Sequence, residues 1–137
     1  MLTLDGKGRV TVPARWRDVL VSACEGQLMV SKSHERCLSL FPRSVWDQFE
    51  TRLATLPASA DGLRRLYIGS ATELAIDGAS RVLIPPELRQ WAGLEREIIF
   101  MGMGNRFELW DKARYDAHEA AVLEQDMSGT LNSLFIG

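Results

Sequence analysis

The sequence predicts an α+β fold built from two copies of one structural unit. Two segments 72 positions apart, 4–17 and 76–89, carry nearly the same pattern of residues. In each copy a short β-type run, a turn, a second short run and a proline-initiated helical segment follow in the same order. Repetition at a fixed spacing is typical of a supersecondary unit used twice, and two units are too few for a solenoid. We therefore expect one pseudo-symmetric domain.

The repeated signature is Asp-Gly-x-x-Arg, followed by an apolar run and a proline. Identical residues occupy five equivalent positions, namely Asp5/Asp77, Gly6/Gly78, Arg9/Arg81, Pro13/Pro85 and Arg17/Arg89. Apolar residues occupy four more, namely Leu4/Ile76, Val10/Val82, Val12/Ile84 and Trp16/Leu88. The likeness continues at smaller offsets, because 27–30 matches 97–100 and 37–41 matches 106–110. The second copy therefore has shorter connecting loops between the same elements.

Local patterns assign the elements of the first copy. Short β-type runs bounded by turn residues are found at 1–5, 10–12, 27–31 and 37–41. The first two flank Gly6-Lys7-Gly8, which has the composition of a hairpin turn. Helical segments follow Pro13 and Pro42, and the first of them ends at Gly26. The second copy repeats this order and closes with an acidic helix over about residues 111–125.

We divide the chain into four segments, and the two repeats together are expected to form one compact domain. The segments are a first repeat (1–57), a connecting helix (58–73), a second repeat (74–127) and a C-terminal tail (128–137). Short strands from these separate pieces must pair with one another to make a sheet.

Composition is ordinary for a globular domain of 137 residues, with 46% apolar and 25% charged residues. No apolar run approaches the ~18 residues of a membrane span, and the N-terminus has no signal-peptide pattern, so a cytoplasmic protein is expected. Cys24 and Cys37 have no paired spacing and are expected to be buried, reduced thiols. No cofactor and no metal site are predicted.

The charge distribution limits how the chain could bind nucleic acid. The formal net charge is −2, whereas nucleic-acid binders are usually basic overall. Residues 1–36 contain six Lys/Arg against four Asp/Glu, while residues 111–137 contain two against five. Any DNA contact must therefore come from a local basic patch, multiplied by assembly of several copies.

The signature has a structural and a functional interpretation. Structurally, the glycine supplies a positive φ, while the aspartate accepts turn amides and pairs with the arginine four residues later. Functionally, Lys7, Arg9 and Arg81 stand at hairpin tips, where a scaffold offers them to a partner. Arginine suits phosphate and the guanine edge because its planar fork donates two hydrogen bonds at once. A two-stranded ribbon can also enter the DNA major groove.

The doubled signature and the end of the second copy resemble the MraZ family. The resemblance is carried by Asp5–Arg17, by its echo Asp77–Arg89, and by residues 102–111, which read Gly-Met-Gly-Asn-Arg-Phe-Glu-Leu-Trp-Asp. It covers essentially the whole chain, and the doubled Asp-x-x-x-Arg with its apolar-proline run is the hallmark of the family. The resemblance implies an AbrB-like, pseudo-twofold, swapped-hairpin β-barrel flanked by helices, whose subunits assemble into rings.

The resemblance also implies a function. Members of the family are bacterial transcriptional regulators that bind short G-rich direct repeats in double-stranded DNA, upstream of the cell-division and cell-wall gene cluster that begins with their own gene. The implied partners are promoter DNA and other copies of the chain, the implied location is the nucleoid, and repression is the expected action. The positions that match the DNA-facing loops are Asp5, Lys7, Gly8, Arg9, Asp77, Ser80 and Arg81.

Two features depart from the family pattern. In the second loop, Ala79-Ser80 stands where the family usually has a glycine immediately before the arginine. Ser80 is expected to be strained if that position needs a positive φ. Because position 79 carries no cation, the second loop is expected to bind DNA less well than the first. The chain also begins closer to its first motif than is usual, so an opening strand of several residues is expected to be missing.

Three other classes of function compete with a DNA-binding regulator. An enzyme is disfavoured because His34 and His118 belong to no catalytic motif, although His34 lies three residues before Cys37. A ring that binds only protein partners fits the doubled signature almost as well. A toxin–antitoxin repressor is disfavoured by the full second copy, since a dimeric antitoxin needs one hairpin unit per chain.

Overall fold

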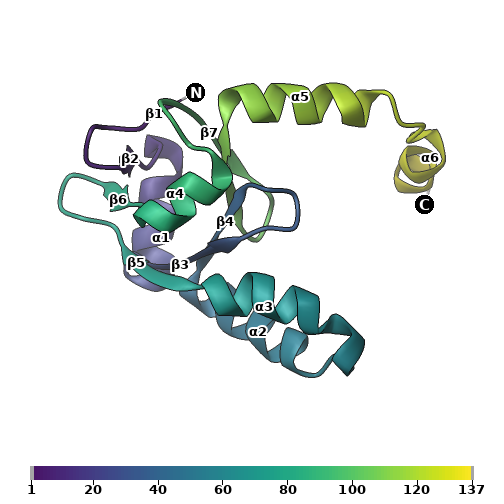
Figure 1. The fold of residues 1–137 in the computed structure, drawn as a ribbon, viewed down its shortest axis with the longest axis horizontal. Coiled ribbons are helices and arrows are strands. Elements are labelled where there is room, and N and C mark those ends of the chain that lie inside the picture. Colours follow the sequence, from purple (N-terminus) through teal and green to yellow (C-terminus); the bar gives the residue numbers. More distant parts are fainter. Residues whose placement is uncertain (1, 137) are drawn as a thin grey trace.

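The computed structural model describes residues 2–136, apart from the side chains of residues 23, 24 and 136 (Figure 1). Met1 of the predicted first strand and Gly137 of the predicted tail lie outside the described residues. The strands are β1 (Leu2–Thr3), β2 (Arg9–Thr11), β3 (Gln27–Lys32), β4 (Leu38–Pro42), β5 (Thr72–Ala75), β6 (Arg81–Leu83), β7 (Glu97–Gly102) and β8 (Phe107–Asp111). The helices are α1 (Ala14–Cys24), α2 (Arg43–Ala54), α3 (Asp61–Ser70), α4 (Pro86–Ala92), α5 (Lys112–Leu123) and α6 (Ser128–Ile136), with a 3₁₀ turn at Ala58–Ala60.

Each half of the chain contributes a hairpin to the main sheet and receives its edge strand from the other half. The strand order is β1-β7-β8-β4-β3-β5, with all pairs antiparallel, and β4 meets β8 at the centre, where Leu38 lies opposite Leu109. At the edges, β1 of the first half pairs with β7, and β5 of the second half pairs with β3. This exchange confirms the predicted α+β, swapped-hairpin fold of two tandem repeats.

The two runs that flank the first signature do not form a hairpin with each other. The amide of Asp5 donates to the carbonyl of Arg9 at 3.0 Å, but beyond this turn the strands separate. β1 continues along β7, while β2 pairs with β6 and places Val10 opposite Val82. The predicted local hairpin is therefore wrong. Because both copies carry the same apolar pattern, pairing between them buries both valines completely.

One core lies between the ribbon, the concave side of the sheet and helices α1 and α4. The ribbon β2–β6 and the residues just after it contribute fully buried side chains, namely Val10, Val12, Val82 and Ile84. Helix α1 adds Leu20 and helix α4 adds Leu88. Val19, the neighbour of Leu20 in α1, is 54% exposed and lies outside this core.

Helices α2 and α3 lie side by side next to β3 and β4 (Figure 1). Their packing surface is aromatic, because Phe41 of β4 contacts Trp46 and Phe49 of α2, with ring centroids 5.2 and 5.1 Å apart. Arg64 of α3 closes the connection between the helices by donating to the carbonyls of Leu53 and Leu56 at 2.8 and 2.9 Å.

The C-terminal part of the chain forms an arm. Helix α5, predicted as an acidic helix, begins after Asp111, whose carboxylate accepts the amide of Arg114 at 3.3 Å. It extends away from the sheet, and α6 lies at its far end (Figure 1). The tail predicted from residue 128 onward is therefore helical through residue 136. None of the described helices is long and apolar enough to cross a membrane.

Candidate nucleic-acid interface

The first signature loop is held together by one carboxylate. Oδ1 of Asp5 accepts the amides of Lys7 and Arg9 at 2.9 and 2.8 Å, and Oδ2 accepts Nε of Arg9 at 2.7 Å. The amide of Gly8 donates to the carbonyl of Asp5 at 3.0 Å and closes the turn. These bonds use only Nε of the Arg9 fork, so the structural role predicted for the Asp–Arg pair is present and its terminal nitrogens have no protein partner among the described residues.

The second loop repeats this geometry. Oδ1 of Asp77 accepts the amides of Ala79 and Arg81, both at 2.9 Å, and Oδ2 accepts Nε of Arg81 at 3.1 Å. The amide of Ser80 donates to the carbonyl of Asp77 at 2.9 Å. The two loops therefore present an arginine in the same way, as their sequences predict.

The positive φ falls on the residue before each arginine. Gly8 has φ 85° and Ser80 has φ 62°, so Ser80 is in the left-handed region that side chains disfavour. Gly6 and Gly78, to which the sequence assigned this role, have φ values outside that region, and a Cβ on either would contact nothing within 4 Å. The expected strain at Ser80 is confirmed, and the assignment to Gly6 and Gly78 is wrong.

Both loops are fixed to the β2–β6 ribbon. The amide of Ile84 donates to the carbonyl of Gly8 at 3.0 Å, and the amide of Val12 donates to that of Ser80 at 2.8 Å. Each loop is thus bonded to the strand that follows the other loop. Matched arginines from helices α1 and α4 bond to the residues just after the two strands. Nε of Arg17 donates to the carbonyl of Val12 at 2.7 Å, and Nε of Arg89 donates to the carbonyl of Ile84 at 3.0 Å.

The outer face of the ribbon carries both signature arginines. Side chains alternate along a strand, and Val10 and Val82 point into the core. Arg9 opposite Leu83 and Thr11 opposite Arg81 therefore share the solvent face. The two arginines are diagonal neighbours on that face, separated by Thr11 and by Leu83, which is 54% exposed.

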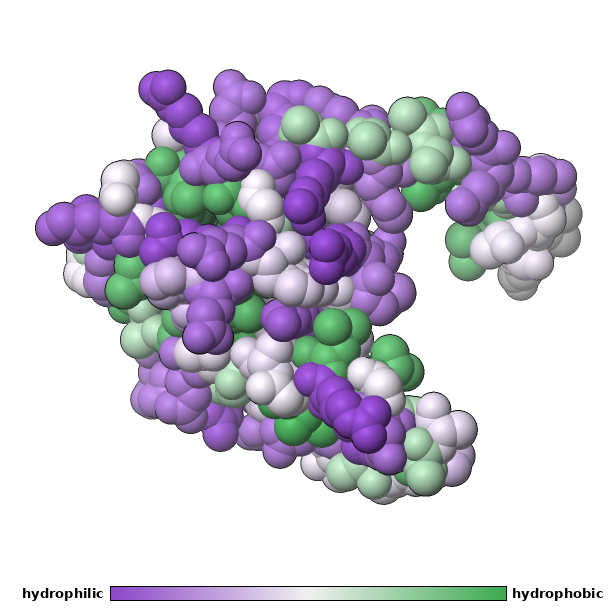
Figure 2. Space-filling model, in the orientation of Figure 1, coloured by the Kyte–Doolittle hydropathy of each residue, from purple (hydrophilic) through white to green (hydrophobic). Residues whose placement is uncertain are grey.

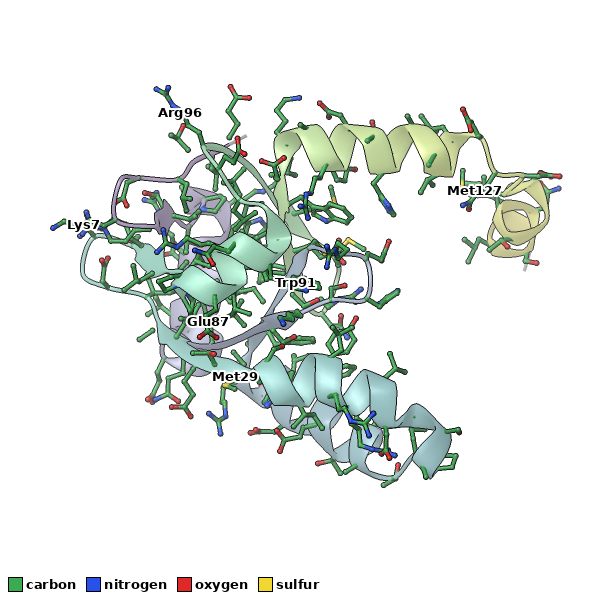
Figure 3. The ribbon with its side chains drawn as sticks, viewed as in Figure 1. Lys7, Met29, Glu87, Trp91, Arg96 and Met127 are labelled. Carbon is green, nitrogen blue, oxygen red and sulfur yellow. The ribbon has the colours of Figure 1, made fainter. Side chains whose placement is uncertain are left out.

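Charge differs between the loops. In the first, Asp5 offsets Arg9 and leaves Lys7 as an additional cation, which points away from the body (Figure 3). In the second, Asp77 offsets Arg81 and position 79 is alanine, so the loop has no net charge. The first loop is the more attractive of the two for a polyanion.

The hydrogen bonds also fix the charge of the signature aspartates. The backbone amide of Arg9, helped by the Arg9 guanidinium and the Lys7 amide, lowers the pKa of Asp5 from 3.8 to about 2. The backbone amide of Arg81 likewise lowers the pKa of Asp77. Both carboxylates therefore stay ionised at neutral pH, and each holds its arginine in one orientation.

All seven predicted site residues are found in these two loops and at the start of the ribbon. Three further residues lie beside them and were not predicted from the sequence. Thr11 and Leu83 share the arginine face, and the alternation with buried Val10, Val82 and Ile84 could have revealed them. Arg96 lies next to the first loop, since its carbonyl accepts the amide of Leu4 at 2.8 Å, and its side chain is exposed. That contact joins distant parts of the chain, so no local pattern points to it.

The residues considered for catalysis are engaged elsewhere. Burial raises the pKa of the Cys37 thiol to about 12, which opposes formation of a nucleophilic thiolate. Nδ1 of His34 lies 2.8 Å from the hydroxyl of Tyr67, and Nε2 of His118 lies 3.0 Å from Glu35. Cys37 is buried and reduced as predicted, whereas the Cys24 side chain lies outside the described residues. Among the described residues, no group of three or more candidate ligands could hold a metal ion.

Sequence comparison agrees with this doubled architecture. A family model described as "MraZ protein, putative antitoxin-like" matches twice, over residues 1–66 and 67–133. The chain belongs to the MraZ family. The predicted family is thereby confirmed, and the two matches divide the chain within α3.

Several MraZ relatives are similar over nearly their full length. A protein of Delftia acidovorans is 50% identical over 126 residues, covering 92% of this chain and 89% of the relative. Proteins of Methylibium petroleiphilum and Leptothrix cholodnii are 48% and 51% identical over 130 residues, covering 95% of this chain and 89% of each relative. All three are named "Transcriptional regulator MraZ", which is a non-enzymatic class, as predicted.

Proposed function

We propose that this chain is a sequence-specific DNA-binding regulator of transcription, and that it acts as a repressor. The observation that carries the proposal is the β2–β6 ribbon, which presents Arg9 and Arg81 on one solvent face from a fixed backbone. Relatives that are 50% and 48% identical are named transcriptional regulators. The targets would be short G-rich direct repeats upstream of the cell-division and cell-wall genes, including the gene of the regulator itself.

The two loops would have different roles at the DNA. Arg9 has terminal guanidinium nitrogens available for the O6 and N7 acceptors of guanine, and Lys7 is placed to contact phosphate. Asp5 would orient Arg9 rather than touch DNA, because its oxygens are occupied by the loop. Gly8 and Ser80 would shape the turns. Arg81, without a neighbouring cation, would add a weaker contact with the backbone of the DNA.

One ribbon makes few contacts, so binding requires several copies. A ring of identical chains would place one Arg9 loop against each direct repeat, and the linked contacts would gain affinity by avidity if their spacing matches. The acidic arm, with five Asp/Glu against two Lys/Arg over residues 111–137, would repel DNA from the rest of the surface. Such a regulator would act in the cytoplasm, at the nucleoid.

The test is a fluorescence-anisotropy titration of the assembled protein. A duplex with the G-rich direct repeats is compared with a scrambled duplex of the same length and composition, at two salt concentrations. We expect tighter binding to the repeats and a steep loss of affinity at the higher salt. Equal binding to both duplexes would reject sequence-specific regulation, and absence of binding would favour a ring that contacts only proteins.

A further inference from the structure

The far end of the C-terminal arm exposes an apolar helix face. Leu131, Leu134 and Phe135 of α6 are spaced i, i+3 and i+4 and therefore lie on one side of the helix. Leu134 is 74% exposed and Phe135 is 85% exposed. Met127 lies where α5 gives way to α6 (Figure 3). In Figure 2 the arm stands clear of the body of the molecule, so the same chain leaves this face uncovered.

Such a helix needs a packing partner. A nine-residue helix is too short to be stable alone in water, even though Asp126 caps it by accepting the amide of Ser128 at 3.0 Å. The base of the arm is fixed to the body of the chain through His118 of α5. Nε2 of His118 lies 3.0 Å from Glu35 on the β3–β4 loop, and its ring lies 4.7 Å from Trp110.

The body of the chain has an aromatic cleft of about 230 Å³ between α2, α3 and the β7–β8 turn. Phe41, Phe49 and Tyr67 line it together with Arg52 and Arg106. Pockets for small molecules typically have ~300–1,000 Å³. The smaller volume suits one or two inserted apolar side chains better than a metabolite.

The arm and the cleft have opposite charges. Glu119, Glu124 and Asp126 precede the apolar face of α6, whereas Arg52 and Arg106 border the cleft. Arg106 is partly offset by Glu108, 3.6 Å away, and Arg52 has no ion pair among the described residues. The acidic arm also makes an anionic lipid surface an unfavourable partner.

We propose that α6 of one copy inserts Leu134 and Phe135 into the Phe41–Tyr67 cleft of a neighbouring copy. This contact joins two different surfaces of the same chain, so it adds subunits head to tail and closes into a ring when the rotation between them permits. The inference rests on the self-association in the proposed function and identifies the surfaces responsible for it.

The first test compares two charge insertions on α6 by size-exclusion chromatography with light scattering. Phe135→Asp places a carboxylate on the apolar face, and Ser133→Asp places it on the opposite face. We expect Phe135→Asp to reduce the assembly, whose mass is a multiple of 15.4 kDa, by at least half while circular dichroism stays unchanged. Ser133→Asp should keep the wild-type mass. Equal masses for Phe135→Asp and wild type would overturn the proposal.

A second test locates the contact and shows whether it joins two chains. Gln48→Cys at the cleft and Leu134→Cys on α6 are made in separate proteins, mixed and oxidised. Peptide mapping should find a disulfide between positions 48 and 134, with much less product when Ser133→Cys replaces Leu134→Cys. Wild type reports the background from Cys24 and Cys37. A third protein carries both cysteines in one chain. No 48–134 disulfide in the mixture, or formation of that disulfide within single chains of this double-cysteine protein when it is oxidised alone, would overturn the proposal.

DNA titration separates this inference from the proposed function. If Phe135→Asp remains fully assembled and still prefers the repeat duplex, the arm contact is rejected and the regulator stands. If Phe135→Asp loses the assembly, but the assembled wild-type protein binds both duplexes equally, the arm contact stands and the regulator is rejected.

Discussion

Gly8 and Ser80 hold the same left-handed backbone conformation in the two halves of the molecule, with φ 85° and 62°. Each lies directly before a signature arginine, and each carbonyl accepts an amide from the strand of the other half. The turn that presents Arg9 and Arg81 is thus one design used twice, with a glycine in one copy and a serine in the other.

Ser80→Gly should stabilise the fold. A side chain in the left-handed region costs roughly 1 kcal/mol, and glycine removes this strain. Part of the gain is lost because glycine has more conformational freedom in the unfolded chain. We expect the free energy of unfolding to rise by about 0.5–1 kcal/mol and Tm to rise by a few degrees in scanning calorimetry. A lower Tm for Ser80→Gly would show that the serine hydroxyl stabilises the loop in another way.

Gly8→Ala should destabilise the fold through both strain and contact. A Cβ on Gly8 would overlap the guanidinium of Arg89, which must shift and so strains its 3.0 Å bond to the carbonyl of Ile84. We expect a loss of roughly 1–3 kcal/mol in urea unfolding. Gly6→Ala is the matched control, because its Cβ meets open space and should change stability by less than about 0.5 kcal/mol. Equal effects of the two substitutions would contradict this account.

Asp5→Asn should weaken the fold only where Asp5 is charged. The Arg9 amide and the other loop donors lower the pKa of this carboxyl from 3.8 to about 2 in the folded chain. The unfolded chain therefore binds the proton more tightly, so the contribution of Asp5 is complete above about pH 4 and disappears as the pH falls toward 2. We expect the Tm difference between wild type and Asp5→Asn to shrink through that window.

The control for this pH dependence is Asp18→Asn, in an exposed position on α1. Its Tm difference from wild type should be small and should not follow the Asp5 window. A difference for Asp5→Asn that stays constant from neutral pH to pH 2 would mean that the loop does not depend on the charge of Asp5.

Lys7 and position 79 should set the salt dependence of DNA binding in opposite directions. Lys7→Ala removes one exposed cation and should lower the slope of log Kd against log salt by about 1, with similar weakening for repeat and scrambled duplexes. Ala79→Lys adds a cation at the equivalent position of the second loop and should raise the slope by about 1. Anisotropy titrations at four salt concentrations measure both, and unchanged slopes would place DNA elsewhere on the surface.

The sequence predicted the order of the elements but not which strands pair. The two copies have the same apolar alternation, so Val10 could be buried by a partner in its own copy or by Val82. Local composition around Gly6 favoured the first arrangement, and the resemblance to the family implied the second. Which strands pair depends on the apolar surface buried in both halves together, and no short segment of the sequence contains that information.

The position of the positive φ in the loop and the helix in the tail were also not predictable from local sequence alone. The turn composition predicted a positive φ in the loop, but only the hydrogen bonds of Asp5 decide that it falls on Gly8 rather than Gly6. In the tail, Leu131, Leu134 and Phe135 have the spacing of an amphipathic helix, but the segment is too short for that spacing alone to predict one. The Asp–Arg pairs were predictable because their four-residue spacing is local.

The most direct measurement of the central claim is the affinity of Arg9→Ala for the repeat duplex, with Arg81→Ala measured beside it and the assembled mass of both variants checked. We expect Arg9→Ala to lose about 1–3 kcal/mol, roughly 5- to 150-fold in Kd for each contact, and to lose its preference over the scrambled duplex. Arg81→Ala should lose less affinity and keep the preference. Wild-type preference in an assembled Arg9→Ala variant would contradict the assignment of the first loop as the part that reads DNA.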